Sequence, residues 1–199
     1  MENVFKEDLL LKEKLLESGI LIDSINDFIQ TKESYLEAIP ILIEFLSHTV
    51  DQIWWKEAIV RSLSTKEAKG IVNKPLLEEY VRTDKQKYSL YCWAIGNAFD
   101  IIIQPEDVDS ILDIVKNKDN GSSRQMFVMA LAKIKTRKKD IENTLIPLLD
   151  DNDITGHTLY TLGKLKSEKS REKIIPFLSH PNSYYKRSAK NALKKIDKE

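Results

Sequence analysis

The sequence predicts an all-α protein, a right-handed superhelix of about five helical hairpins preceded by N-terminal capping helices. The first observation is a recurring block, in which a small residue is followed by Leu, any residue, Lys and an aliphatic residue. The block occurs at 130–134, 161–165 and 192–196. A fixed period of about thirty residues is typical of stacked repeats. The second observation is the composition, because six Gly and six Pro are few for an all-β chain with its many turns.

Each hairpin is expected to contribute a second helix that carries one matching buried aliphatic residue. The matching positions are Leu63, Ile95, Leu131, Leu162 and Leu193. The steps between them are 32, 36, 31 and 31 residues. The second helices are therefore expected at 55–66, 87–98, 123–134, 154–165 and 185–196.

The chain is predicted to be a single repeat domain over 1–199. Residues 1–32 should cap the open end of the array with two amphipathic helices, at 4–18 and 20–30. The repeats are expected at about 33–66, 74–99, 106–135, 138–166 and 170–197. Three of the first helices place a proline inside an apolar run, at Pro40, Pro147 and Pro176. An interior proline removes a backbone donor and costs about 3 kcal/mol, so these helices are expected to kink.

The repeats resemble the HEAT-like repeats of the phycobilisome-lyase type. Their pattern is similar to Leu-Leu-x-Asp-x-(Asp/Asn)-x-Val-Arg-x-x-Ala-x-x-Ala-Leu-Gly-Lys-Ile, which 148–165 follows closely and 176–196 follows moderately. The stretch 123–134 matches through Arg124 and its Ala-Leu-x-Lys-Ile ending. The whole chain also resembles small bacterial HEAT-repeat proteins of undetermined role. The resemblance implies an armadillo-like α-α superhelix and leaves the activity open.

Composition and cysteine usage favour a cytoplasmic globular protein. Charged residues make up 31% of the chain and hydrophobic residues 42%, with a formal net charge of zero. Cys92 is the only cysteine, so no disulfide can form within the chain. The N-terminus lacks the layout of a signal peptide. The longest uncharged run, 88–99, is too short to span a bilayer, so no membrane association is expected.

The inner, concave face of such an array is lined by second helices, on which positions four apart share one side. One predicted inward column reads Arg61, Trp93, Met129, Tyr160 and Asn191. Another reads Thr65, Asn97, Lys133, Lys164 and Lys195. A column expected to face the core reads Ala58, Leu90, Met126, His157 and Ser188. Aromatic and Arg side chains carry most of the energy at many interfaces. The binding residues predicted from this face are Arg61, Trp93, Arg124, Met129, Tyr160 and Lys164.

No catalytic residues, metal ligands or cofactor site can be assigned from the sequence. The three histidines, His48, His157 and His180, are scattered, and none is followed by Glu. Iron-dependent hydroxylases built on similar repeats use His-Glu pairs. A zinc cluster is equally unsupported with a single cysteine. The expectation is a protein without enzymatic activity, metal or cofactor.

The predicted function is a scaffold that presents its concave face to a protein or peptide partner. From Ile154 onward the chain has eleven Lys and Arg against four Asp and Glu, a net charge of +7. That excess suits an acidic partner, although a solvated terminal repeat would also explain it. The alternative is a nucleic-acid-binding protein related to the HEAT-like alkylpurine DNA glycosylases. Nucleic-acid binding rests mainly on the basic residues of the C-terminal end, Lys164, Lys186, Arg187, Lys190, Lys194 and Lys195. The glycosylase variant rests on the stretch 53–56, which holds Trp54 and Trp55, together with Arg61, Trp93 and Arg124, whereas the neutral overall charge speaks against duplex binding.

Overall fold

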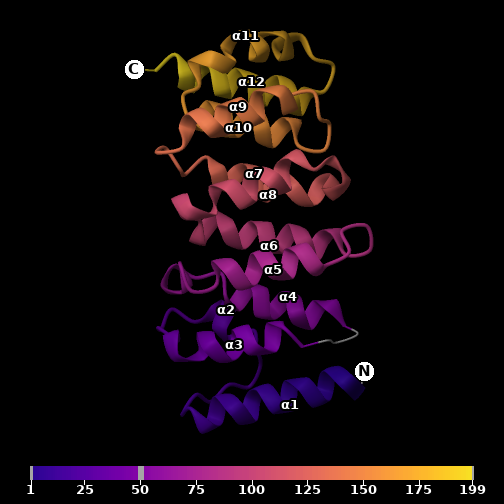
Figure 1. The fold of residues 1–199 in the computed structure, drawn as a ribbon, viewed down its shortest axis with the longest axis vertical. Helices are drawn as coiled ribbons and strands as arrows, with labels where there is room; N and C mark the ends of the chain where they lie inside the picture. The colour runs from indigo at the N-terminus through magenta and orange to yellow at the C-terminus, as the bar shows by residue number, and fades with distance from the viewer. Residues whose placement is uncertain (1, 49–51, 199) are drawn as a thin grey trace. The chain divides into compact units, whose positions relative to one another are not determined.

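The computed structural model describes residues 2–48 and 52–198, and every regular element in these ranges is helical (Figure 1). The α-helices are α1 (Glu2–Glu17), α2 (Asp27–Gln30), α3 (Ile39–Leu46), α4 (Ile53–Ser62), α5 (Asn73–Arg82), α6 (Ser89–Ile102), α7 (Val108–Lys116), α8 (Gln125–Leu131), α9 (Lys138–Leu145), α10 (Thr155–Lys164), α11 (Arg171–Ile174) and α12 (Ser183–Ile196). Short 3₁₀ segments join them: η1 (Leu36–Ala38), η2 (Lys66–Ala68), η3 (Pro105–Asp107), η4 (Lys118–Arg124), η5 (Ile146–Leu148), η6 (Glu168–Ser170) and η7 (Ile175–Ser179). None of the helices in the described ranges is long and apolar enough to cross a membrane.

The chain divides into two compact units, unit 1 ending at Ile102 and unit 2 beginning at Ile103. In unit 1, α1 packs on α3, α3 on α4, and α4 and α5 on α6. In unit 2, α7 packs on α8, α8 on α10, and α10 on α12. Neighbouring helices along the chain therefore supply the packing within each unit. That the whole chain forms one domain stays a prediction.

The five predicted second helices are present as α4, α6, α8, α10 and α12. All five matching aliphatic residues, from Leu63 to Leu193, are buried, which confirms the alignment of the repeats at these positions. One neighbouring core prediction is wrong. Leu90, expected in the core, lies in the first turn of α6 and keeps 79% of its surface exposed. Its counterpart one repeat earlier, Ala58, is buried.

Proline positions explain where the first helices change geometry. Pro147 lies in η5 directly after α9, and Pro176 lies in η7 directly after α11. In both places the α-helix gives way to a 3₁₀ segment, because proline cannot donate the backbone hydrogen bond of a continuing α-helix. Pro40 instead lies in the first turn of α3, after η1, where its missing N–H is tolerated.

The second capping helix, predicted over 20–30, is wrong except for its final turn, α2. Gly19 has a positive φ of 79°, which ends α1 and turns the chain. The Asp27 carboxylate then accepts backbone N–H groups from Asp23 and Ser24, at 2.8 and 3.1 Å. Short polar side chains that bind nearby backbone groups in this way compete with helix formation. Residues 20–26 are therefore a turn rather than a helix.

Candidate functional site

The six predicted binding residues are divided between the two units. Arg61 and Trp93 belong to α4 and α6 of unit 1, which pack against each other. The Arg61 guanidinium is exposed and donates to the Glu57 carboxylate from Nε and Nη2, at 3.0 and 2.6 Å. Trp93 is half-buried. Arg61 thus already has a carboxylate partner one turn away, which neutralises much of its charge.

A polar hollow of about 510 Å³ lies beside Arg61 in unit 1. Its charged lining residues are Lys32, Arg61 and Lys66 against Glu33 and Glu67, and Arg61 is already paired with Glu57. Trp93 is not among the residues that line it. This mixture gives the hollow no clear preference for a charged ligand.

Arg124 is a correction, because the structure places it in the interior of unit 2 rather than on a binding face. Its side chain is fully buried, and it donates to the Asp151 carboxylate at 2.9 Å. It also donates to the carbonyl oxygens of Val115 at 3.0 Å and Gly121 at 2.8 Å. The physical reason is helical geometry, since adjacent residues point about 100° apart. Gln125 lies toward the surface, and Arg124 turns inward to join the end of α7 to the loop before α10.

The adjacent tryptophans of α4, Trp54 and Trp55, also point in different directions. Trp55 is buried, with Nε1 donating to the Asp8 carboxylate at 3.1 Å and its ring edge-on to Phe45. Trp54 keeps 61% of its surface exposed. Two of the side chains on which the glycosylase alternative rests, Trp55 and Arg124, are therefore unavailable to a ligand in this structure.

The remaining three predicted residues lie at the surface of unit 2. Met129 on α8 is half-buried, and Tyr160 and Lys164, one turn apart on α10, are exposed. The Lys164 Nζ lies 5.7 Å from the centroid of the Tyr160 ring. A second ammonium, from Lys195 on α12, lies 4.9 Å from the same centroid. Each is a cation–π contact, so two ammonium groups are attracted to the same tyrosine ring.

Close packing of α10 on α12 brings Lys195 to Tyr160. A Cβ added to Gly163 would lie 2.6 Å from the Cα of Ala192, so the two backbones approach as closely as they do because residue 163 is glycine. Gly156, near the start of α10, leaves room in the same way for the ring of Tyr184 on α12. Gly163, the glycine of the Leu-Gly-Lys repeat ending, thus allows the close contact between α10 and α12.

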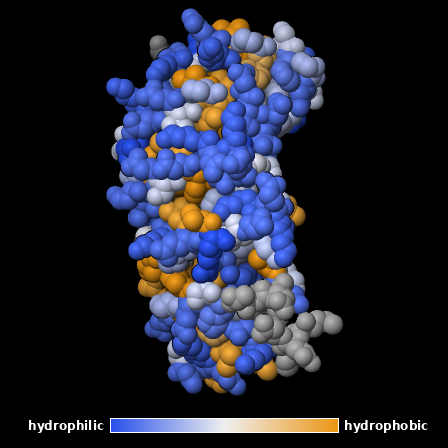
Figure 2. Space-filling view, turned by 45° about the vertical axis from the view of Figure 1, so that its right-hand side comes forward, coloured by the Kyte–Doolittle hydropathy of each residue, from blue (hydrophilic) through white to orange (hydrophobic). Residues whose placement is uncertain are grey.

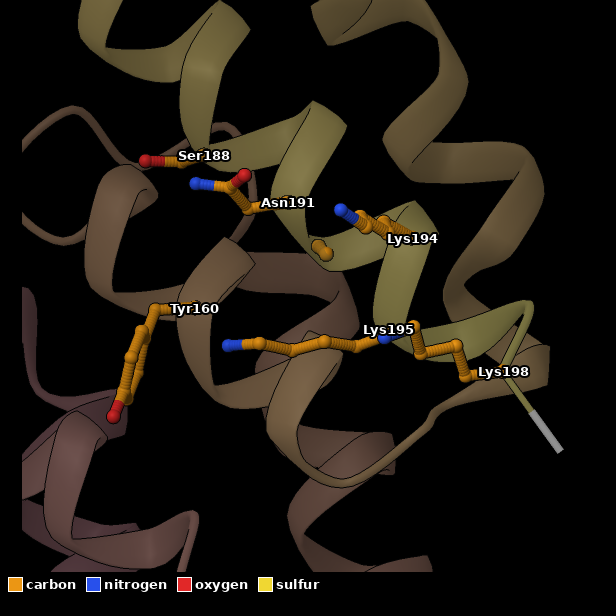
Figure 3. Close-up of a pocket in the computed structure, with 7 residues that line it drawn as sticks. Tyr160, Ser188, Asn191, Lys194, Lys195 and Lys198 are labelled. Atoms are coloured by element: carbon orange, nitrogen blue, oxygen red, sulfur yellow. The ribbon is translucent and has the colours of Figure 1, made fainter.

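The residues around this ring form what we call the Tyr160 cluster (Figure 3). Its members are Tyr160, Lys164, Ser188, Asn191, Lys194, Lys195 and Lys198. Apart from Lys164, these side chains line a hollow of about 330 Å³ at the surface. Figure 3 shows the Lys195 chain extended from α12 toward the Tyr160 ring, with Asn191 and Ser188 on the preceding turns of the same helix.

Positive charge in the cluster has no carboxylate partner among the described residues. Burial lowers the pKa of the Lys195 ammonium, and the neighbouring charge of Lys164 lowers this pKa further. The acidic side chain of α12's C-terminal cap, Asp197, is paired with Arg171. Among the residues that the structure describes, no carboxylate forms an ion pair with Lys164, Lys194 or Lys195.

Of the seven members, only Tyr160 and Lys164 belong to the binding residues predicted for a protein partner. Lys194 and Lys195 were predicted only as contacts for nucleic acid. Asn191 and Lys195 share predicted columns with Tyr160 and Lys164, and all four are exposed or half-buried. Ser188 was expected in the core, and Lys198 was counted only in the basic C-terminal end. Their convergence depends on how α12 lies against α10, which the helical period alone does not give.

Groups with catalytic potential are isolated from one another. Cys92 is buried, and burial raises the pKa of its thiol to about 11. His157 is half-buried, and burial lowers the pKa of its imidazole. Within residues 2–48 and 52–198, no three His, Cys, Asp or Glu side chains lie close enough together to hold a metal ion.

Apolar surface is scattered by comparison. The face drawn in Figure 2 is largely hydrophilic, and its hydrophobic residues gather in separate patches instead of one continuous band. A long apolar groove of the kind that receives an amphipathic helix is not visible on this face. Recognition on this side of the molecule would rely on charge and polar contacts more than on apolar burial.

Comparisons with known proteins support the fold alone. No protein-family model and no curated protein matches the chain. Among solved structures, the chain is similar to the crystal structure of an engineered protein, a target of the Northeast Structural Genomics Consortium. The TM-score is 0.51 and the sequence identity 16%, over 87% of this chain and 90% of that one. At this identity the likeness extends to an all-helical, repeat-like architecture and says nothing of activity.

Proposed function

We propose that the protein is a non-enzymatic binding module that captures an acidic segment of a protein partner at the Tyr160 cluster. The observation that carries the proposal is the pair of lysine ammoniums, Lys164 and Lys195, on one exposed tyrosine ring without a carboxylate partner. Carboxylates from a partner would relieve the repulsion between the two lysines. The tyrosine ring would add apolar contact area at a low cost in side-chain entropy.

Further basic residues on α12 extend the surface along which such a segment would lie. Arg187 lies one helical turn before Asn191, which lies one turn before Lys195, so the three share a side of the helix. Lys186, Arg187 and Lys190 are exposed and form no ion pair among the described residues. Such a field raises the rate at which an acidic partner associates, and salt weakens it.

The finer description of the fold belongs to the same proposal. The five helix pairs would be HEAT-like repeats of the phycobilisome-lyase type, arranged as a right-handed superhelix in a cytoplasmic scaffold protein. Support comes from the repeat ending around Gly163 and from the Arg124–Asp151 ion pair, which joins one helix pair to the next. Both belong to the residues that carry the sequence resemblance.

Nucleic-acid binding is the second candidate, and the unpaired basic residues of α12 favour it. Lysines and arginines along one helix neutralise phosphates, and an exposed tyrosine gives a base a stacking surface. Two ammoniums, however, already lie 5.7 and 4.9 Å from the centroid of the Tyr160 ring. A base that stacks on the ring would compete with them, so we place this candidate second.

The test is the affinity of a fluorescently labelled Glu-rich peptide for the full chain, measured by anisotropy. We expect the double variant Lys164→Gln/Lys195→Gln to weaken binding about tenfold or more, since two ion pairs and two cation–π contacts are lost. Lys173→Gln, which removes an exposed unpaired lysine from α11, is the matched control and should bind within a factor of about two of the natural chain.

A neutral peptide, with Gln in place of Glu, should show no binding at the same concentrations. A single-stranded oligonucleotide of equal charge should compete poorly. Equal loss of affinity in the double variant and the Lys173→Gln control would show that only overall charge matters. Tighter binding of the oligonucleotide than of the acidic peptide would favour the second candidate.

A further inference from the structure

The Tyr160 cluster combines more positive charge than one carboxylate can balance. Lys194, Lys195 and Lys198 line the hollow, and Lys164 adds a further ammonium close to the same tyrosine ring. One Asp or Glu of a bound segment would supply a single negative charge. A phosphoryl group carries about −1.5 to −2 charges at neutral pH, which matches a pair of ammoniums.

Two further polar side chains line the hollow. Ser188 and Asn191 lie one turn apart on α12, on the turns that precede Lys195. Within the described part of the chain neither side chain has a hydrogen-bond partner, so the Ser188 hydroxyl and the Asn191 amide are both free to donate. A phosphoryl group offers three strong acceptor oxygens, one more than a carboxylate, and would engage these donors together with the lysines.

The dimensions of the hollow limit what enters it. At about 330 Å³ it lies at the small end of the range for ligand sites, about 300–1,000 Å³. One side chain of a longer segment fits such a space, and the flanking residues would then extend along the basic surface of α12. The Tyr160 ring would contact the carbon atoms of the inserted side chain.

From this arrangement we infer that the Tyr160 cluster binds the phosphoryl group of a phosphorylated serine or threonine within an acidic segment of a partner protein. The inference rests on the proposed function, because it specifies which acidic segment the same surface prefers. Lys164 and Lys195 would balance the charge, and Ser188 and Asn191 would donate to the phosphoryl oxygens.

The test compares four labelled peptides that differ only at one central site, which holds Ser, phosphoserine, Glu or Glu-Glu. Binding to the full chain is measured by anisotropy at constant salt. We expect the phosphoserine peptide to bind about fivefold or more tighter than the Glu peptide, because the phosphoryl group carries about −1.5 to −2 charges against −1 for the carboxylate and offers three acceptor oxygens instead of two. The Ser peptide should bind most weakly.

Variants locate the preference. Lys195→Gln should reduce the ratio of phosphoserine to Glu affinity to about one. A change of about fivefold in affinity is of the size that the loss of one ion pair near the surface produces. Lys173→Gln should leave the ratio unchanged, and far-ultraviolet circular dichroism should show both variants folded. A ratio that survives in folded Lys195→Gln would overturn the inference, because the phosphoryl group would then be bound elsewhere.

Other outcomes separate the inference from the proposed function. If the Glu-Glu peptide binds as tightly as the phosphoserine peptide, the cluster responds only to the total negative charge of the peptide. The inference is then wrong, and the proposed function stands. If no acidic peptide binds, both fall. Inorganic phosphate should displace the phosphoserine peptide only at concentrations well above the dissociation constant of that peptide. Displacement at or below that concentration would make the site one for free phosphate and would overturn the inference.

Discussion

Two clusters of charged residues, one in each unit, differ in whether the protein supplies the opposite charge. In unit 1 the Glu79 carboxylate is 2% exposed and accepts from Lys56 Nζ at 2.6 Å and from the Tyr91 hydroxyl at 2.8 Å. Arg82 is a third partner of the same carboxylate. In unit 2 the Tyr160 cluster gathers lysines at the surface without any carboxylate.

The difference separates charges that hold the fold from charges that are free to bind. A buried carboxylate is stable only when it is paired and hydrogen-bonded, and Glu79 satisfies this condition with three partners. Burial and the adjacent carboxylate both raise the pKa of the Tyr91 hydroxyl, which keeps it a hydrogen-bond donor to Glu79. Lys164 and Lys195 of the Tyr160 cluster repel one another and have no carboxylate partner among the described residues, so a ligand can supply the opposite charge.

The largest effect is expected from removing the negative charge of the buried Glu79 carboxylate in unit 1. Glu79→Gln leaves Lys56 buried without its counter-charge, which should lower the free energy of unfolding by about 3–5 kcal/mol. Chemical denaturation followed by circular dichroism measures this loss. Glu78→Gln is the control, because Glu78 is exposed and its distance to Lys74 is 3.8 Å. A loss for Glu79→Gln no larger than for Glu78→Gln would break the comparison.

The next largest effect is expected from breaking the buried Arg124–Asp151 ion pair of unit 2. Arg124→Gln leaves the Asp151 carboxylate, which is 8% exposed, without its buried partner, and it should cost about 3 kcal/mol in unfolding free energy. Arg137→Gln should cost far less, since solvent screens the pairs that Arg137 makes with Asp109 and Asp140. Similar denaturation midpoints for the two variants would mean that burial of the Arg124 pair adds nothing to stability.

Substitutions in the Tyr160 cluster, in contrast, should hardly change stability. Lys164→Gln and Lys195→Gln should each change the free energy of unfolding by about 0.5 kcal/mol or less, because these lysines form no ion pair within the protein. Removing one of two repelling charges favours a small gain rather than a loss. Thermal unfolding at low and high salt measures the change. A clear destabilisation by either substitution would assign these lysines a structural use.

The smallest effect is a pH dependence that arises at His157, a half-buried group without a counter-charge. Burial lowers the pKa of this imidazole below its ordinary value of 6.5, so the unfolded chain binds the proton more readily than the folded one. The stability that His157 contributes is therefore present above pH of about 6.5 and is lost as the pH falls below that value. His157→Gln should show a smaller loss of unfolding free energy between pH 7.5 and 5.5 than the natural chain, with both measured in urea.

Helical period in the sequence predicted which side of each second helix faces the core, and it did so because every stacked pair repeats the same contact. The buried residues Leu131, Leu162 and Leu193 show this. Period does not predict what lies across from a side chain. Arginine is usually found at the surface, yet Arg124 is buried because the aspartates of the loop before α10 supply its counter-charge.

The Tyr160 cluster was predicted in part for a related reason. Tyr160 and Lys164 lie on one helix, so their spacing in sequence places them together. Lys195 lies on the next second helix, and its approach depends on the glycine contact between Gly163 and Ala192. A turn formed by Asp27 and its neighbours likewise replaced a predicted helix at 20–26, because local side-chain hydrogen bonds overrode the apolar pattern.

The central claim is that an acidic segment binds at the Tyr160 cluster, and chemical-shift mapping by nuclear magnetic resonance tests it most directly. A Glu-rich peptide is titrated into the isotopically labelled full chain. The account predicts that the largest shifts fall on α10 and α12 around Tyr160, Lys164 and Lys195, while Arg61 and Trp93 of unit 1 move little. Shifts centred on unit 1, or none anywhere at saturating peptide, would contradict it.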